Sequence, residues 1–289
     1  MIAQSFQYES PGTIAEAISL LQKYGDEAKI LSGGHSLIPM MKLRFASPGY
    51  LIDINNIKGL SHINEENGIV KIGALTREAE IEHSDLLKKY FPIFGDVTKQ
   101  IADPQVRNRG TVGGNLAHGD AANDHPAVML ALRANIVITG PEGNRTVPID
   151  EFFFGFYTTA IQQNEILTEI QIPIPPVGTG SAYHKLERKV GDYATAGVAV
   201  QLTLDRKGIC TAAGMGLTNV NPVPLRAVRS EEALLGKLIT DGSIAEAAKY
   251  ASEDCSPSSD LRGSEEYKRA MVAVLVKRMI HKAVERITK

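Results

Sequence analysis

The chain has 289 residues, of which 43% are hydrophobic, and its 31 lysines and arginines stand against 33 aspartates and glutamates for a formal net charge of −2. This near-neutral balance gives no electrostatic case for binding nucleic acid or an anionic membrane. The length suffices for two domains with their own cores. Cys210 and Cys255 are too few for a disulfide framework and lack the C-x-x-C spacing of a metal or redox motif.

The sequence shows no pattern typical of a membrane-spanning or targeting segment. No apolar run approaches the length that spans a membrane, and residues 1–5 lack the basic and then apolar character of a secretion signal. No internal repeat or low-complexity segment interrupts the chain. We therefore expect a cytoplasmic protein without a membrane span.

The first elements are a short strand, a helix and a second strand, expected around residues 6–8, 14–24 and 28–31. Thr13 as N-cap and Glu16 three positions later form a capping box, and Gly25 ends the helix at an expected left-handed position. No G-x-G-x-x-G joins a strand to this helix, so we do not predict a Rossmann unit. The second strand leads instead into Ser32-Gly33-Gly34-His35-Ser36-Leu37.

The middle of the chain alternates strands and helices. Strands are expected at 51–54 and 69–72, helices at 77–87 and from Pro92 to about Ile101, and a second glycine-bearing loop at 111–116. Asp124 as N-cap and Pro126 in the first turn then predict a helix over 127–132. A hairpin of 135–139 with 145–147 and a strand at 165–172 follow.

The segment 173–180 is rich in proline and glycine and predicts a linker. Strands at 181–186, 194–204 and 209–216 then suggest an antiparallel meander, and the pattern is helical from Glu231 onward. The fold class is therefore α+β. We expect a two-lobed domain over residues 1–177, with lobes of about 1–55 and 56–177, and a smaller domain over 178–289.

Two loops with paired glycines carry the main chemical signal. Glycine tolerates positive φ, so consecutive backbone N–H groups can point into one concavity and bind an anion, above all phosphate. The loops are 32–37 and 111–116, and Arg107 and Arg109 lead into the second. Two such loops suggest a ligand with two phosphates, although each Gly-Gly pair alone is equally consistent with a tight turn.

Together these loops resemble those of a known family. The stretch 28–37, followed by Lys42-Leu43-Arg44, resembles the first flavin loop of the FAD-binding medium subunit of the molybdenum hydroxylases, and the stretch 101–116 resembles its second. The continuation 119–127 is most similar to the carbon monoxide dehydrogenase branch, which usually has proline where Ala121 stands. The resemblance covers nearly the whole chain.

The resemblance implies a two-lobed PCMH-type FAD-binding domain, followed by a smaller domain of three antiparallel strands and helices. It implies that both loops hold the FAD pyrophosphate and that Asp124 contacts the polar chain of the flavin. Ile101 and Leu167 would make apolar contacts with the cofactor. Lys185 and Tyr193 would reach it from the C-terminal domain, with Tyr193 near the isoalloxazine. The cofactor-binding residues that it implies are Lys29, Ile30, Leu31, Ser32, Gly33, Gly34, His35, Ser36, Leu37, Ile101, Thr111, Gly114, Asn115, Asp124, Leu167, Lys185 and Tyr193.

The function that the resemblance implies is electron transfer. FAD would receive electrons from [2Fe–2S] clusters on a small partner subunit, after substrate oxidation at a molybdenum-pterin site on a large partner subunit, and would pass them to an external acceptor. With two cysteines, this chain cannot itself hold a cluster. No catalytic residue for substrate is expected here. The implied activity is that of an aerobic carbon monoxide dehydrogenase or a xanthine dehydrogenase-type relative.

Other interpretations stay open from the residues alone. Asp124 is fully explained as a helix cap, Tyr193 as a core tyrosine at a strand end, and Lys185 as a solvated strand lysine. The residues His118, Asp120, Asp124 and His125 lie close in sequence without H-x-x-x-H or H-E-x-x-H spacing, so we predict no metal site. The alternative functions are a self-contained flavoenzyme of the vanillyl-alcohol oxidase-like group and a non-catalytic flavin-carrying protein.

Overall fold

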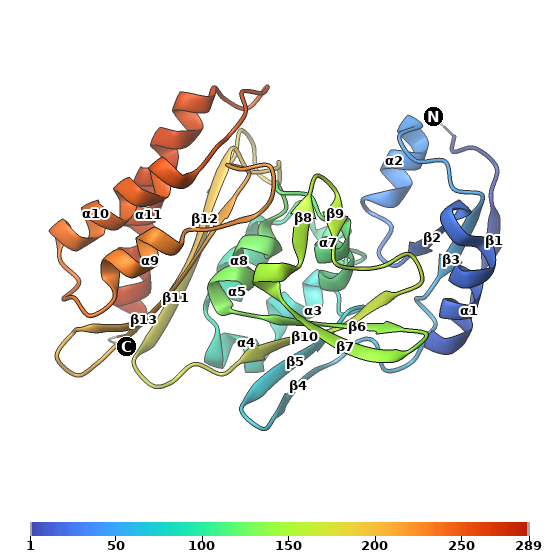
Figure 1. Ribbon diagram of the computed structural model, residues 1–289, viewed down its shortest axis with the longest axis horizontal. Helices are drawn as coiled ribbons and strands as arrows, with labels where there is room; N and C mark the ends of the chain where they lie inside the picture. The colour runs from blue at the N-terminus through green and yellow to red at the C-terminus, as the bar shows by residue number, and fades with distance from the viewer. Residues whose placement is uncertain (1, 288–289) are drawn as a thin grey trace.

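The computed structural model describes residues 2–287 and has three main sheets. Figure 1 shows them side by side: a small N-terminal lobe, a central five-stranded sheet with its helices, and a C-terminal sheet covered by three helices. The α+β class is confirmed. The three sheets define the sides of the space in which the glycine-bearing segments lie.

The N-terminal lobe is a parallel sheet of order β1-β3-β2 with α1 packed against it. Its elements are β1 (Gln7–Glu9), α1 (Ile14–Tyr24), the 3₁₀ turn Gly25–Glu27, β2 (Ala28–Leu31), α2 (Leu37–Leu43) and β3 (Tyr50–Asp53). The Thr13 hydroxyl accepts from Glu16 N at 3.2 Å, but the Glu16 carboxylate accepts from Gly12 N, so the capping box is only half formed. Gly25 has φ 54° with ψ −134°, which is outside the expected left-handed helical region.

The second lobe is an antiparallel sheet of order β4-β5-β10-β6-β7. Its strands are β4 (Ile63–Glu66), β5 (Ile69–Gly73), β6 (Asn135–Gly140), β7 (Gly143–Pro148) and β10 (Ile166–Pro173), with a separate ribbon of β8 (Phe153–Gly155) and β9 (Thr158–Thr159). Its helices are α3 (Glu78–His83), α4 (Asp85–Tyr90), α5 (Ile93–Gln100), α6 (Pro104–Arg107), α7 (Val112–His118) and α8 (Asp124–Leu132), with a 3₁₀ turn at Ile149–Glu151. The single helix expected over 77–87 is wrong, because Ser84 is extended and its hydroxyl caps a new helix by accepting from Leu87 N.

The C-terminal sheet has the order β11-β12-β13-β14 and is antiparallel throughout. Its elements are β11 (Thr179–Leu186), β12 (Ala196–Leu204), β13 (Cys210–Thr218), β14 (Leu225–Arg226), α9 (Val228–Leu234), α10 (Asp241–Asp254) and α11 (Glu265–Ile287). The expected three-stranded meander is present, and the short β14 extends it. α11 packs on β11 and β12, whereas α8 packs on β12 and β13.

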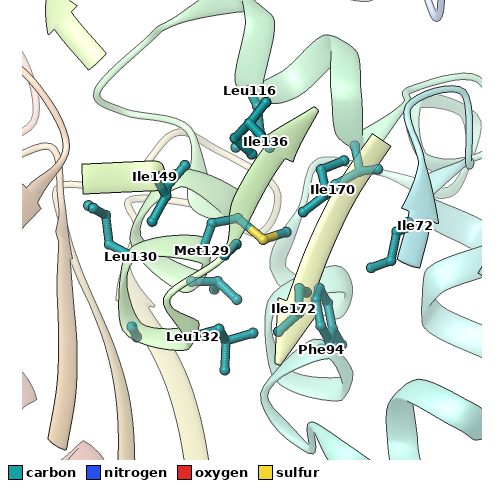
Figure 2. Packing of buried hydrophobic residues seen from close by; sticks show 14 of the residues in the cluster. Ile72, Phe94, Leu116, Met129, Leu130, Leu132, Ile136, Ile149, Ile170 and Ile172 are labelled. Atoms are coloured by element: carbon teal, nitrogen blue, oxygen red, sulfur yellow. The ribbon is translucent and has the colours of Figure 1, made fainter. Parts of the chain in front are cut away.

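Helix α8 lies between the central and C-terminal sheets, and every one of its residues is buried. Figure 2 shows its Met129, Leu130 and Leu132 beside residues of the central sheet such as Ile136 and Ile170. Tyr183 and Ala199 of the C-terminal sheet belong to the same core cluster. A helix that is apolar all round is typical of this doubly covered position, and it makes the contact between the two parts of the chain a continuous core.

Candidate functional site

The predicted site residues surround one cavity of about 780 Å³, which lies within the range of roughly 300–1,000 Å³ typical of cofactor sites. The first loop, the start of α7, the start of α8 and the loop between β11 and β12 all line it. The predicted residues that line it are Lys29, Ile30, Ser32, Gly33, Gly34, His35, Ser36, Leu37, Ile101, Thr111, Gly114, Asn115, Asp124, Leu167, Lys185 and Tyr193. Leu31 is the exception, and its side chain packs beside Gly34.

The first loop provides the anion cradle. The backbone N–H groups of residues 32–36 have no hydrogen-bond partner anywhere in the described chain from residue 2 to 287. Gly34 has φ 77°, but Gly33 does not have positive φ, so the expectation that positive φ explains both glycines is wrong. Gly33 is required by close approach, because a Cβ there would lie 2.5 Å from Arg109 O. The two glycine-bearing segments therefore pack directly on each other.

The second glycine segment is not a loop, as was expected, but the first turn of α7. Thr111 is its N-cap, and the Thr111 hydroxyl accepts from Gly114 N at 3.1 Å. The neighbouring N–H groups of Val112, Gly113 and Asn115 donate to carbonyls of Thr76, Ala74 and Thr111. This segment therefore offers side chains rather than backbone donors, and the first loop alone is a backbone nest.

Two polar atoms mark where this second segment meets the cavity. Ser32 Oγ lies 3.2 Å from Thr111 Oγ1 and links the two segments. Asn115 Oδ1 is buried and has no hydrogen-bond partner among residues 2–287. An orphaned buried acceptor is unfavourable in an empty site. Together with the free N–H groups of the first loop, it fits a bound dinucleotide with an anionic pyrophosphate and hydroxyl donors.

Asp124 is the first residue of α8 and not its N-cap, which is Asn123. One oxygen of its carboxylate accepts from the Tyr183 hydroxyl, and the other accepts from Lys185 Nζ at 2.9 Å. Lys185 is only 2% exposed, so the interpretation of it as a solvated lysine is wrong. Burial raises the pKa of Asp124, although the nearby positive charge of Lys185 partly offsets this effect. Burial and the negative charge of Asp124 together raise the pKa of Tyr183 well above 10. The carboxylate of Asp124 thus joins α8 to β11.

Tyr183 was not among the predicted site residues, although the sequence contains a signal for it. Residues two apart on a strand share a face, so Tyr183 had to lie on the same side of β11 as Lys185. Glu78 and His125 were also missed as a pair. His125 Nε2 lies 2.7 Å from a Glu78 carboxylate oxygen, His125 is fully buried, and Glu78 lines the cavity.

Tyr193 lies in the loop between β11 and β12, at the edge of the cavity, and is 45% exposed. The interpretation of Tyr193 as a core tyrosine is therefore wrong. The Arg262 guanidinium lies 5.6 Å from the centre of its ring, and Arg262 also donates to Asp192 at 2.8 Å. The hydrogen bond from Arg262 holds the pKa of Asp192 at about 2. Ile101 and Leu167 are buried apolar walls of the same cavity.

In the part of the chain that the structure describes, no group of three or more His, Cys, Asp or Glu side chains is arranged to hold a metal ion. Among the described helices, none combines the length and apolar character that crossing a bilayer requires.

Comparisons with known proteins identify the family of the chain. Residues 4–175 match the family model "FAD binding domain in molybdopterin dehydrogenase", and residues 181–283 match "CO dehydrogenase flavoprotein C-terminal domain". The chain is 48% identical to the carbon monoxide dehydrogenase medium chain of Hydrogenophaga pseudoflava, over 98% of each chain. It is 46% identical to the medium chain of Afipia carboxidovorans, over 99% of each.

A solved carbon monoxide dehydrogenase structure from Hydrogenophaga pseudoflava has a chain with a TM-score of 0.97 and 49% identity, covering 99% of both chains. These likenesses extend over both parts of the chain and include the glycine-bearing segments. The chain therefore belongs to the family of FAD-binding medium subunits of the molybdenum hydroxylases, which are oxidoreductase subunits.

Proposed function

We propose that this chain is the electron-transfer subunit of an aerobic carbon monoxide dehydrogenase-type complex. FAD bound in the cavity accepts electrons from [2Fe–2S] clusters on a small partner subunit and passes them to an external acceptor. The observation that carries the proposal is the cavity itself, in which a backbone anion nest faces charged and aromatic groups from the C-terminal sheet. The close similarity to carbon monoxide dehydrogenase medium chains supports the choice of complex.

The residues around the cavity divide the work of holding FAD. A hydrogen bond from a backbone N–H to a charged acceptor contributes about 1.5–3 kcal/mol, so the free N–H groups of residues 32–36 suffice for the pyrophosphate. Ile101 and Leu167 supply apolar contacts, and Thr111, Gly114 and Asn115 border the nest. Lys185 and Tyr193 come from the C-terminal side, where a cation and an aromatic ring are placed to tune the redox potential of the isoalloxazine.

The two functional parts of the chain correspond to a domain over residues 1–177 and one over 178–289. Their junction falls between the end of β10 at Pro173 and the start of β11 at Thr179. The cavity draws residues from both, since Lys185 and Tyr193 follow the junction and the remaining predicted contacts precede it. Cofactor binding therefore depends on how the two domains are held together.

The proposal requires partner subunits. Both cysteines, Cys210 and Cys255, are buried and apart from the cavity, so electrons must arrive from a cluster on another chain. We propose that the small [2Fe–2S] subunit docks at the edge of the cavity near Tyr193, with a large molybdenum-pterin subunit beyond it. Tyr157 lines the cavity, and its neighbours Phe154 and Phe156 are also exposed aromatic side chains. We expect the assembly to act in the cytoplasm.

The test compares flavin reduction in the isolated chain and in the assembled complex. Anaerobic carbon monoxide should rapidly bleach the flavin absorbance of the complex and should leave that of the isolated FAD-loaded chain unchanged. Purines should reduce the flavin of neither. Acid or heat should release free FAD from the complex, because no covalent attachment is expected. Rapid reduction of the isolated chain by either substrate would overturn the proposal and favour a self-contained flavoenzyme. Reduction of the complex by purines alone would overturn the choice of branch.

A further inference from the structure

A buried carboxylate with one unused oxygen lies in the wall of the cavity. Glu78, the first residue of α3, is 2% exposed and lines the cavity. Its Oε2 atom lies 2.7 Å from His125 Nε2, whereas its Oε1 atom has no hydrogen-bond partner among residues 2–287. A buried carboxylate usually has its acceptor capacity satisfied. Oε1 is not one of the fully buried atoms that lack a partner, so it is open to the cavity and can accept from a group bound there.

Glu78 is fixed between the two sides of the cavity. Its backbone N–H donates to Gly110 O at 3.1 Å, directly before Thr111, and its carboxylate pairs with His125, directly after Asp124. Burial disfavours the charged form of His125, but the Glu78 carboxylate outweighs burial and raises the pKa of His125 above its usual 6.5. Because a carboxylate oxygen accepts, His125 Nε2 is the donor to Glu78 Oε2, which leaves Oε1 as the acceptor for the cavity.

The other carboxylates of the cavity wall already have donors, including the exposed Asp26, which accepts from Gln163. Asp124 bonds Tyr183 and Lys185, Glu165 pairs with Arg145, and Asp192 pairs with Arg262. A carboxylate beside a phosphate would be repelled, so the partner of Glu78 must be a neutral donor. In the proposed binding mode the pyrophosphate occupies the nest at residues 32–36 and the ring lies toward Lys185 and Tyr193. The part of FAD that joins these two is the ribityl chain, whose polar groups are hydroxyls.

We propose that Glu78 is a cofactor-binding residue whose Oε1 accepts a hydrogen bond from a ribityl hydroxyl of FAD, with His125 as the positioning residue that holds the carboxylate. This rests on the proposed function, since it requires FAD in the cavity. The substitution Glu78→Gln separates the two halves of the claim. Its amide oxygen must face the His125 N–H, so its NH₂ group faces the cavity and the charged acceptor is lost. A ribityl hydroxyl can then only accept from that NH₂ group, in a weaker bond between two neutral groups.

The experiment is a cycle that combines the protein variant with an altered ligand. The protein is the full chain, purified in its native assembly and then depleted of flavin. FAD and its 2′-, 3′- and 4′-deoxyribityl analogues are titrated into it, and dissociation constants are measured by fluorescence. In the wild type, one analogue should bind at least about tenfold more weakly than FAD. E78Q should discriminate between that analogue and FAD clearly less than the wild type does, because a bond between neutral groups replaces one to a carboxylate. Glu142→Gln, at the exposed tip of the β6–β7 hairpin, should behave as the wild type.

Two results would overturn the proposal: wild type that binds all three analogues as tightly as FAD, or E78Q that discriminates among them as the wild type does. If E78Q does not fold, Glu78→Asp keeps the charge but withdraws it by one methylene and should lose the same discrimination. Retained discrimination in that variant would also contradict the proposal. Failure of the wild type to bind FAD at all would instead overturn the proposed function, so the two failures are distinguishable.

Discussion

At the scale of single residues, the glycines of the cavity act mainly through close approach. Of Gly33, Gly34, Gly113 and Gly114, Gly34 alone has positive φ. A Cβ on Gly113 would lie 2.6 Å from Ala74 O, and one on Gly114 would lie 2.7 Å from both Ser32 Oγ and Thr111 Oγ1. These glycines therefore let backbone segments and hydroxyls meet at distances that no side chain would allow.

Gly114→Ala should therefore weaken FAD binding. The added methyl group separates Ser32 Oγ from Thr111 Oγ1 and pushes the first loop away from α7. We expect affinity for FAD to fall by about tenfold, as when one hydrogen bond to a charged group is lost. Gly95→Ala is the matched control, since Gly95 is also helical and its Cβ would meet nothing within 4 Å. Equal FAD affinity in G114A and wild type would contradict this account of the contact.

His125 should make stability depend on pH. Burial lowers the pKa of His125, but pairing with Glu78 outweighs it and raises the pKa in the folded protein above the unfolded value of 6.5. The contribution of His125 to the free energy of unfolding is therefore fully present below pH 6.5 and is lost as the pH rises through the pKa of the folded protein. Urea unfolding from about pH 6 to about pH 9 should show a decline in the free energy of unfolding that His125→Gln lacks. Parallel profiles for the two proteins would show that the pair does not titrate in this way.

At the scale of elements, apolar periodicity and helix caps predicted β2, β5, β10, the β6–β7 hairpin and the C-terminal meander. They failed for α7, which was expected to be a loop, and did not predict α2. Glycine is a poor helix former, and the start of α7 is helical because Thr111 caps it and Ala74 O receives Gly113 N. The Thr111 cap is local, but the bond from Gly113 N to Ala74 O joins residues far apart in the chain, so sequence pattern alone does not contain it. The Glu78–His125 pair was missed for the same reason.

Helix α8 depends on two glycines of β13. A Cβ on Gly216 would overlap Ala127 O, and one on Gly214 would overlap Ala131 O. Gly216→Ala should therefore force α8 away from the sheet and lower the free energy of unfolding by about 1–3 kcal/mol, as overpacked cores do. Gly242→Ala, on the exposed first turn of α10, should be neutral or stabilising. Thermal unfolding of the two variants checks this, and an unchanged midpoint for G216A would be inconsistent with the packing described.

At the scale of the whole molecule, the cavity exists because two domains are held in register. Asp96 on α5 accepts hydrogen bonds from Lys282 and Arg286 of α11 and from the backbone of Tyr183 on β11. Burial opposes the charge of Asp96, but the bonds from Arg286 and Lys282 outweigh it and hold the pKa below 3.8. Since the folded-state value is depressed, the stability from this clamp is present above pH 3.8 and is lost as the pH falls through that depressed value.

Asp96→Asn should loosen the C-terminal domain, because it leaves Lys282 and Arg286 without their carboxylate. We expect the free energy of unfolding to fall by about 1–3 kcal/mol. FAD affinity should fall as well, although Asp96 is not part of the cavity wall, because Lys185 and Tyr193 reach the cavity from the domain that the clamp holds. The control is Asp85→Asn, which removes a fully exposed carboxylate beside Lys88 and should change neither quantity. Urea unfolding and flavin titration of the same preparations measure both effects. A D96N protein that lost stability but bound FAD as tightly as wild type would mean that the domains hold the cofactor independently of this clamp.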